Sequence, residues 1–270
     1  MPSKVRTCKP GLAGIFLLAL SCSTALADER GAGAPGRGTY VSLFGGGGVS
    51  SSSDVTQFGT VLFPEAVGGA LSVHATGRSD TSGVGLGGLQ IGHEWGSTGS
   101  RLLPALEIEG FYLANTQRVT LDNPGPRLPE HTFDDTFRMH NAVFLANVVL
   151  SFPVYQRVIP YVGGGLGAAR ISISGAESAQ TNPPESGINH FNSGPDSTSW
   201  SFAAQAKAGV RIALGDSAYV FGEYRYLFVG SADHIFGPTV YPTHAPTTAW
   251  TVHFDDMSNH LAVGGIGFNF

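Results

Sequence analysis

The connections between strand-like segments alternate in length along this chain of 270 residues. Side chains of a strand alternate between its two faces, so a half-buried strand shows apolar residues at every second position. The segments with this pattern are 39–47, 83–95, 103–113, 139–152, 159–173, 201–213, 218–229 and 260–270. Their connections are long, short, long, short, long, short and long. Such alternation is typical of an up-and-down barrel, whose alternate connections share a rim, and not of a Greek-key sandwich. We therefore predict an all-β fold, an eight-stranded antiparallel up-and-down transmembrane β-barrel.

The polar faces of three of these segments carry opposite charges. They hold Glu107, Glu109, Lys207, Arg211, Glu223 and Arg225. In a soluble sandwich such charges would meet water and the apolar faces would form the core. In a membrane barrel the apolar faces meet lipid and the charges pair in the lumen. Three acids match three bases, and buried charge is tolerated only with such partners. We therefore predict that the six residues form a salt-bridge cluster that plugs the lumen.

The N-terminus has the pattern of a secretory signal peptide, residues 1–27. Basic residues (Lys4, Arg6 and Lys9) precede an apolar run at 11–20, and Ala25-Leu26-Ala27 forms a small-x-small cleavage site. The run is shorter than the roughly 20 apolar residues that span a bilayer. A lipoprotein signal at Cys22 is the weaker alternative, because Ala19 stands where such sites usually have Leu. We expect a flexible lead-in at 28–38 and the barrel domain at 39–270.

Cysteine positions and net charge limit the disulfides and the partners that the mature chain can have. Both cysteines, Cys8 and Cys22, lie in the predicted signal peptide, so the mature chain is expected to contain no disulfide. Cleavage removes 3 of the 15 basic residues and none of the 20 acidic ones, which leaves 12 basic residues and a formal charge of −8. This charge argues against nucleic acid as a partner.

Details of the segments add three further expectations. Interfacial aromatic residues are expected near strand ends, at Trp95, Tyr112, Phe152, Tyr224 and Tyr226. The apolar phase of 83–95 shifts at Gly87-Gly88, which predicts a β-bulge there. The long connection 48–81 contains a short stretch at 59–63 that could pair as an extra hairpin, so a ten-stranded variant stays open.

Several segments resemble the small outer-membrane β-barrel family of Gram-negative bacteria, the OmpA/OmpX-like proteins also called the porin family or opacity-type surface antigens. The segments are 105–110 (ALEIEG), 146–153 (ANVVLSFP), 160–167 (PYVGGGLG), 208–216 (AGVRIALGD), 222–226 (GEYRY) and the terminal Gly265-x-x-Phe268-x-Phe270. The resemblance implies location in the cell outer membrane, contact with membrane lipids and lipopolysaccharide, and a terminal signal, Gly265, Phe268 and Phe270, for the barrel-assembly machinery. The resemblance gives almost no information about biological role.

For function, we predict a non-enzymatic membrane scaffold that displays long surface loops, with surface antigen, adhesion or envelope-integrity roles and a host or surface ligand at the loops. A narrow porin for small solutes is the alternative, and an outer-leaflet lipid A hydrolase is less favoured. Barrel deacylases use a His-x-Ser pair, but here Ser193 follows His190 at one residue too far. We therefore predict no catalytic residue. Loop histidines could bind a metal, but none forms an HxH or HxxxH pair, so we also predict no metal site and no cofactor. The loop histidines are His74, His131, His190, His234, His244 and His253.

Overall fold

Antiparallel strands make up most of the computed structural model. The structure describes residues 38–97, 99–125, 127–155 and 157–270. The elements are β1 (Gly38–Ser50), β2 (Asp54–Val61), η2 (Glu65–Val67, a 3-10 turn), β3 (Leu71–Ser79), β4 (Ser82–Glu94), β5 (Leu103–Asp122), β6 (Thr132–Ser151), β7 (Val158–Asn182), β8 (Ser197–Ala213), β9 (Ala218–Val229), β10 (Ala232–Phe236), β11 (Trp250–Phe254) and β12 (Met257–Asn269). The predicted signal peptide, 1–27, and all but the last residue of the lead-in lie outside the described residues. Within the described ranges, no helix is long and apolar enough to cross a membrane.

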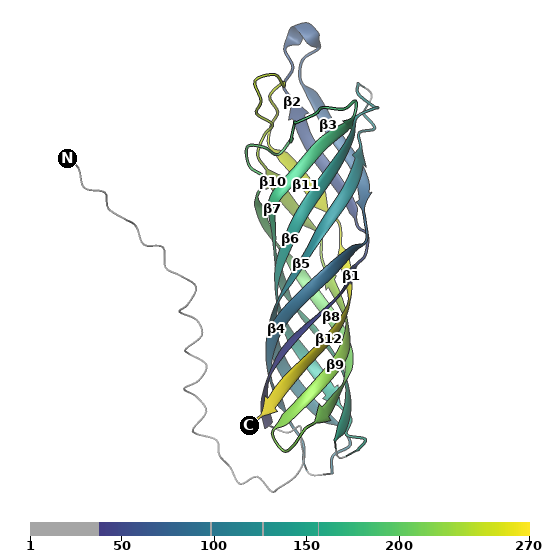
Figure 1. Ribbon diagram of the computed structural model, residues 1–270, viewed down its shortest axis with the longest axis vertical. Helices are drawn as coiled ribbons and strands as arrows, with labels where there is room; N and C mark the ends of the chain where they lie inside the picture. The colour runs from purple at the N-terminus through teal and green to yellow at the C-terminus, as the bar shows by residue number, and fades with distance from the viewer. Residues whose placement is uncertain (1–37, 98, 126, 156) are drawn as a thin grey trace, which may run out of the picture. The chain divides into compact units, whose positions relative to one another are not determined.

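Eight of the strands close into a ring, which confirms the predicted barrel. The order around the ring is β1, β4, β5, β6, β7, β8, β9 and β12. The ring closes where β1 pairs with β12, from Tyr40 opposite Asn269 to Ser50 opposite Asn259. The short connections after β4, β6 and β8 and the C-terminus lie at one rim, the lower one in Figure 1.

The remaining strands continue the sheet beyond the opposite rim. Their order is β10-β11-β2-β3, and β3 joins the end of β5 at Val119–Asp122. The Gly237 amide donates a hydrogen bond to the Gly194 carbonyl (2.9 Å), which links the β10 side to the β7–β8 connection. We call β2, β3, β10, β11, residues 116–122, 132–138 and 174–182, and the connections 183–196 and 237–249 the strand extension (Figure 1). The hairpin expected in 48–81 is therefore β2–β3, but it pairs within the extension, so the ring keeps eight strands.

The long connections were expected to be polar loops, and much of their length proves to be strand. The cause is visible on β5, whose pairing with β6 runs without a break from Leu103 opposite Ser151 to Asp122 opposite Thr132. Near the short turns, Ile108 faces outward (66% exposed) and Glu109 faces inward. Near the other end, Leu121 faces inward and Thr120 outward. Polarity inverts along one continuous strand, so a search for a single apolar face ends the strand too early.

The β-bulge predicted at Gly87-Gly88 was wrong. Both glycines pair in register with β1, opposite Gly45 and Phe44, and β4 shows no register shift. The apolar phase changes because Val84 faces inward and is buried, while Leu89 faces outward. Here too the interior becomes apolar further from the short turns, and the backbone stays regular.

Candidate functional site

The structure places all six predicted lumen charges inside the ring, each no more than 6% exposed. The Lys207 ammonium pairs with Glu107 and lies 3.6 Å from Glu109 Oε2. The Arg225 guanidinium contacts Glu109 Oε2 at 3.1 Å and also pairs with Glu223. Five of the six side chains, contributed by β5, β8 and β9, thus form one connected network across the lumen.

Arg211 does not join this network; it pairs with a residue that the sequence analysis missed. Its Nη1 lies 3.1 Å from Glu94 Oε2, at the short-turn end of the lumen. Glu94 is 1% exposed and also accepts a hydrogen bond from Ser151 Oγ (2.7 Å). A signal was present in the sequence, because Glu94 stands on the face of 83–95 that holds Gln90, opposite Leu89. The lumen therefore holds four acids against three bases.

Neutral donors supplement the bases at the carboxylates. Tyr40 donates to Glu107 Oε2 (2.9 Å) and Tyr161 donates to Glu223 Oε2 (2.7 Å). The Gln205 amide donates to Glu109. A buried carboxylate needs hydrogen bonds as well as an opposite charge, because each lone pair loses water on burial. These donors are the physical reason why four acids are accommodated beside three bases.

Aromatic rings enclose the two arginines. The Arg211 guanidinium lies 4.8 Å, 4.9 Å and 5.5 Å from the ring centroids of Tyr40, Tyr161 and Tyr219. The Arg225 guanidinium lies 4.2 Å from the centroid of Phe44. Such cation–π contacts replace part of the hydration that an enclosed guanidinium gives up.

Above the charges, the ring is filled mainly by apolar side chains, with buried polar residues such as Gln117 and Asn141 among them. The buried set there includes Phe44, Phe111, Leu113, Met139, Val143, Leu145, Ile171, Leu227 and Leu261. An eight-stranded barrel is just wide enough for side chains to fill its interior. The lumen therefore contains a salt-bridged layer below an apolar layer.

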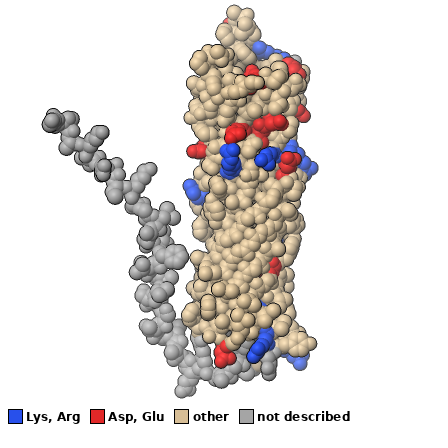
Figure 2. Space-filling model, viewed as in Figure 1, with Lys and Arg blue, Asp and Glu red and all other residues tan. Residues whose placement is uncertain are grey.

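The outer wall of the ring presents the opposite chemistry. Leu106, Ile108 and Leu166 are 56%, 66% and 63% exposed. Figure 2 shows a band nearly free of charged side chains between the lower rim and a belt of charge higher up. Nine residue steps separate Leu103 from Tyr112; at about 3.3 Å per step and a tilt of about 40°, this is roughly 23 Å along the axis, close to the ~25 Å apolar band of membrane barrels.

Apolar residues facing outward around a closed ring, with charges paired inside, decide the class of protein. The chain is a small transmembrane β-barrel. No protein-family model matches its sequence, and no curated protein does either.

Solved structures of other barrels are similar in fold. The outer membrane protein OprG from Pseudomonas aeruginosa is 14% identical, covering 88% of this chain and 98% of that one, with a TM-score of 0.41. Neisserial surface protein A is 16% identical, covering 86% and 97%, with a TM-score of 0.33. The outer membrane protease OmpT from Escherichia coli is 9% identical, covering 85% and 97%, with a TM-score of 0.35. Because each TM-score is below 0.5, the membrane assignment of this barrel rests on its own side-chain distribution.

The predicted interfacial aromatics lie at different heights on the barrel. Trp95 and Phe152 directly follow β4 and β6 at the short-turn rim, where they are 46% and 41% exposed. Tyr112 is not at a strand end, because β5 continues for ten residues to Asp122; its ring stacks on His140 (5.8 Å).

The remaining two tyrosines, Tyr224 and Tyr226, both contact His260. The Tyr224 hydroxyl lies 2.6 Å from His260 Nδ1, and the Tyr226 ring packs edge-on against the imidazole at 5.3 Å.

The three residues of the predicted terminal assembly signal differ in their surroundings. Phe268 and Phe270 point outward and are 51% and 55% exposed. Gly265 turns inward, and a Cβ there would lie 2.5 Å from the Phe221 ring and 2.4 Å from the Leu43 carbonyl oxygen. Besides any role in assembly, Gly265 thus makes room for Phe221.

The strand extension has an apolar core of its own, which the sequence analysis did not anticipate. Phe137 packs against the rings of Phe191, Phe236 and Phe254 at 6.1 Å, 5.9 Å and 5.0 Å. All four side chains are at most 1% exposed. This is the polarity of a protein in water, with aromatic residues inside, and it is the reverse of the membrane ring.

Buried ionisable groups also occur in the extension. Burial raises the pKa of Asp135 to about 8, aided by the charge of Asp134. Burial likewise lowers the pKa of His234 to about 4. Both groups are therefore expected to make the stability of the extension depend on pH.

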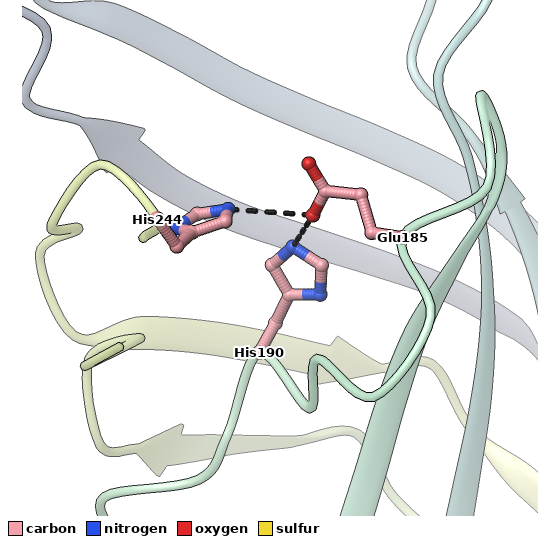
Figure 3. Close-up of side chains that lie close together, drawn as sticks. All are labelled: Glu185, His190 and His244. Atoms are coloured by element: carbon pink, nitrogen blue, oxygen red, sulfur yellow. Dashed lines mark ion pairs between the residues drawn. The ribbon is translucent and has the colours of Figure 1, made fainter. Parts of the chain in front are cut away.

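One cluster in the extension could hold a metal ion. Glu185 and His190 from the β7–β8 connection and His244 from the β10–β11 connection bring their donor atoms within 4.8 Å of one another (Figure 3). The sequence analysis considered both histidines but found no short-range pair, because 53 positions separate His190 from His244.

Proposed function

We propose that this protein is a non-enzymatic scaffold of the Gram-negative outer membrane, closed to solutes, which holds the strand extension outside the cell. The observation that carries the proposal is the filled lumen. Buried ion pairs join β5, β8 and β9 across it, and an apolar layer lies above them. A conducting pore needs a continuous hydrated path, and charges paired at these distances leave little room for water.

The extension supports the display part of this proposal. In outer-membrane barrels the short turns face the periplasm and the long connections face outside. Here the long connections fold around an aromatic core, so they present a surface of fixed geometry. We propose that a host or surface ligand binds this surface. Membrane lipids, lipopolysaccharide and the barrel-assembly machinery are the other proposed partners.

A surface hollow supports lipopolysaccharide as one of these partners. Arg118 and Arg138 line a hollow of about 630 Å³ beside His140. Its lining on β5, 114–118, follows directly after Tyr112, and Asp80 also lines it. We propose that this is the height where the phosphates of an outer leaflet are found. Guanidinium groups are well suited to bind phosphate.

Single-channel recording in planar bilayers tests the closed lumen. The refolded wild-type protein is expected to show no steady conductance. The narrow porin alternative predicts steady conductance that Glu107→Ala or Arg211→Ala alters. Glu177→Ala serves as the control, because this carboxylate lies in the extension, paired with Arg138 at 3.0 Å and 58% exposed. Steady wild-type conductance that responds to the lumen variants and not to the control would refute the scaffold proposal.

Surface proteolysis of intact cells tests the orientation. Cuts are expected in the connections that are not strand, 62–70, 123–131, 183–196 and 237–249, and not in the short turns. Cuts confined to 95–102, 152–157 or 214–217 would mean that the barrel is inserted the other way round.

A further inference from the structure

We propose that Glu185, His190 and His244 form a Zn²⁺ site that fastens the β7–β8 connection to the β10–β11 connection. The proposal goes beyond the scaffold function and stands on the geometry of the cluster. The three donor atoms are His190 Nε2, His244 Nε2 and Glu185 Oε2, and all three point toward one another in Figure 3.

The two distances from Glu185 suit a tetrahedral ion, and the two imidazole nitrogens lie within 4.8 Å of each other. Glu185 Oε2 lies 3.6 Å from His190 Nε2 and 3.4 Å from His244 Nε2. Ligands at about 2.0–2.1 Å from a tetrahedral Zn²⁺ are about 3.4 Å apart. A Zn²⁺ ion could therefore bind with only small movements of the side chains.

Hydrogen bonds to the backbone leave Nε2 of both imidazoles available to bind a metal ion. His190 Nδ1 lies 3.1 Å from the Ser178 carbonyl oxygen, and His244 Nδ1 lies 2.6 Å from the Ala245 carbonyl oxygen. A carbonyl only accepts, so in each ring Nδ1 carries the proton and Nε2 of the neutral ring keeps its lone pair. Backbone carbonyls commonly orient metal-binding histidines in this way.

A cation between the donors would complete this arrangement. Two nitrogen lone pairs face the same carboxylate oxygen, and Glu185 Oε2 is buried without a hydrogen-bond donor among the described residues. Lone pairs that face one another repel, and a buried carboxylate oxygen without a donor is costly. A divalent cation would remove both costs at once.

The types of ligand indicate zinc over the hard cations. Two imidazoles and one carboxylate match Zn²⁺, whereas Ca²⁺ and Mg²⁺ prefer oxygen ligands alone. Partial exposure of the Glu185 and His244 side chains, 34% and 14%, leaves an entry path and room for a water as fourth ligand. His190 is held by edge-on contacts with Phe133 (5.3 Å) and Trp250 (6.0 Å), so one ligand is fixed before the ion arrives.

A bound ion would strengthen an existing junction. The Asn192 side chain already bonds both backbone groups of Val240, at 2.8 Å and 2.9 Å, close to the cluster in sequence. The three ligands would add a cross-link between the same two connections. Zinc is therefore expected to protect both connections from protease.

Calorimetric titration tests the site on the full chain, refolded in detergent and stripped with a chelator. ZnCl₂ is expected to bind one ion per chain, whereas CaCl₂ gives no heat of binding. Glu185→Gln and His244→Gln are each expected to weaken Zn²⁺ binding at least tenfold. Glu177→Gln and His74→Gln are matched controls, because Glu177 pairs with Arg138 and His74 stacks on Phe58 at 4.6 Å, away from the cluster.

Two further measurements keep the outcome clear. Heat-modifiable gel migration shows whether each variant is folded. Glu185 and His244 are substituted because their side chains are more exposed than that of His190, so folding should tolerate the change. Proteinase K digestion with and without Zn²⁺ is expected to show slower cleavage in 183–196 and 237–249. Absence of binding, or binding that neither ligand variant weakens, would overturn the proposed site.

Discussion

Replacing Lys207 by Met is expected to destabilise the barrel by about 3–5 kcal/mol. The ammonium is 3% exposed, pairs with Glu107 and lies 3.6 Å from Glu109. At an effective dielectric constant of about 20, two unit charges 3.6 Å apart attract by about 4.6 kcal/mol. Removing one partner of a buried pair leaves an uncompensated charge, whose cost is typically about 3–5 kcal/mol. Methionine keeps most of the volume, so lost packing adds little.

The surface pair Arg78–Asp54 supplies the matched control. Its charged groups are 3.5 Å apart, almost the same distance as Lys207 to Glu109, but the side chains are 67% and 65% exposed. Arg78→Met is therefore expected to cost at most about 1 kcal/mol. Urea unfolding of the protein in lipid vesicles, followed by tryptophan fluorescence and gel migration, measures both changes.

A double variant separates lost charge from lost shape. Adding Glu107→Gln to Lys207→Met is expected to recover more than half of the lost stability. The side chain at position 107 is then neutral, and Glu109 keeps its 3.1 Å contact with Arg225. If Lys207→Met costs no more than Arg78→Met, the lumen charges are hydrated and the description of a sealed lumen is wrong.

Three further changes test the extension and the packing of the ring. The pKa of Asp135 is raised to about 8, so the folded state keeps a proton that the unfolded chain releases near pH 4. The stability of the extension should therefore fall as pH rises from about 4 to 8, by up to about 1.4 kcal/mol per pH unit. Asp135→Asn should reduce this pH dependence, as measured by unfolding at several pH values. Phe137→Ala should destabilise the extension by about 3–5 kcal/mol and speed its proteolysis, while the exposed Phe58→Ala should not. Gly265→Val should slow or block folding into vesicles because its side chain would collide with Phe221, as measured by the yield of heat-modifiable barrel.

The ring could be predicted because two simple physical rules act on it alone. Lipid outside and paired charges inside impose a period of two, which placed Glu107, Lys207 and Arg225 on one side of their strands. The alternation of long and short connections then gave the number of strands and their order. The pairing of Arg211 with Glu94 was not predicted, because alternation gives the face of each residue and not the height at which residues from different strands meet.

The extension and its histidine cluster could not be obtained by the same reasoning. On β5 the apolar residues change from the outer face at Ile108 to the inner face at Leu121, because the surrounding solvent changes from lipid to water along one strand. A fixed pattern of polarity therefore describes only the half of the strand that lies in the membrane. His190 and His244 meet because β7, β10 and β11 bring their connections together, and no spacing in the sequence contains that information.

The sequence by itself determined which face of each ring strand meets lipid and which faces the lumen, because apolar and polar residues alternate along the strand. Only the tertiary structure decided which charges are partners, that the long connections extend the same sheet beyond the rim, and where Glu185 meets two histidines. The physical reason is that burial acts on each residue locally, whereas contacts between distant segments depend on the register and tilt with which the strands close.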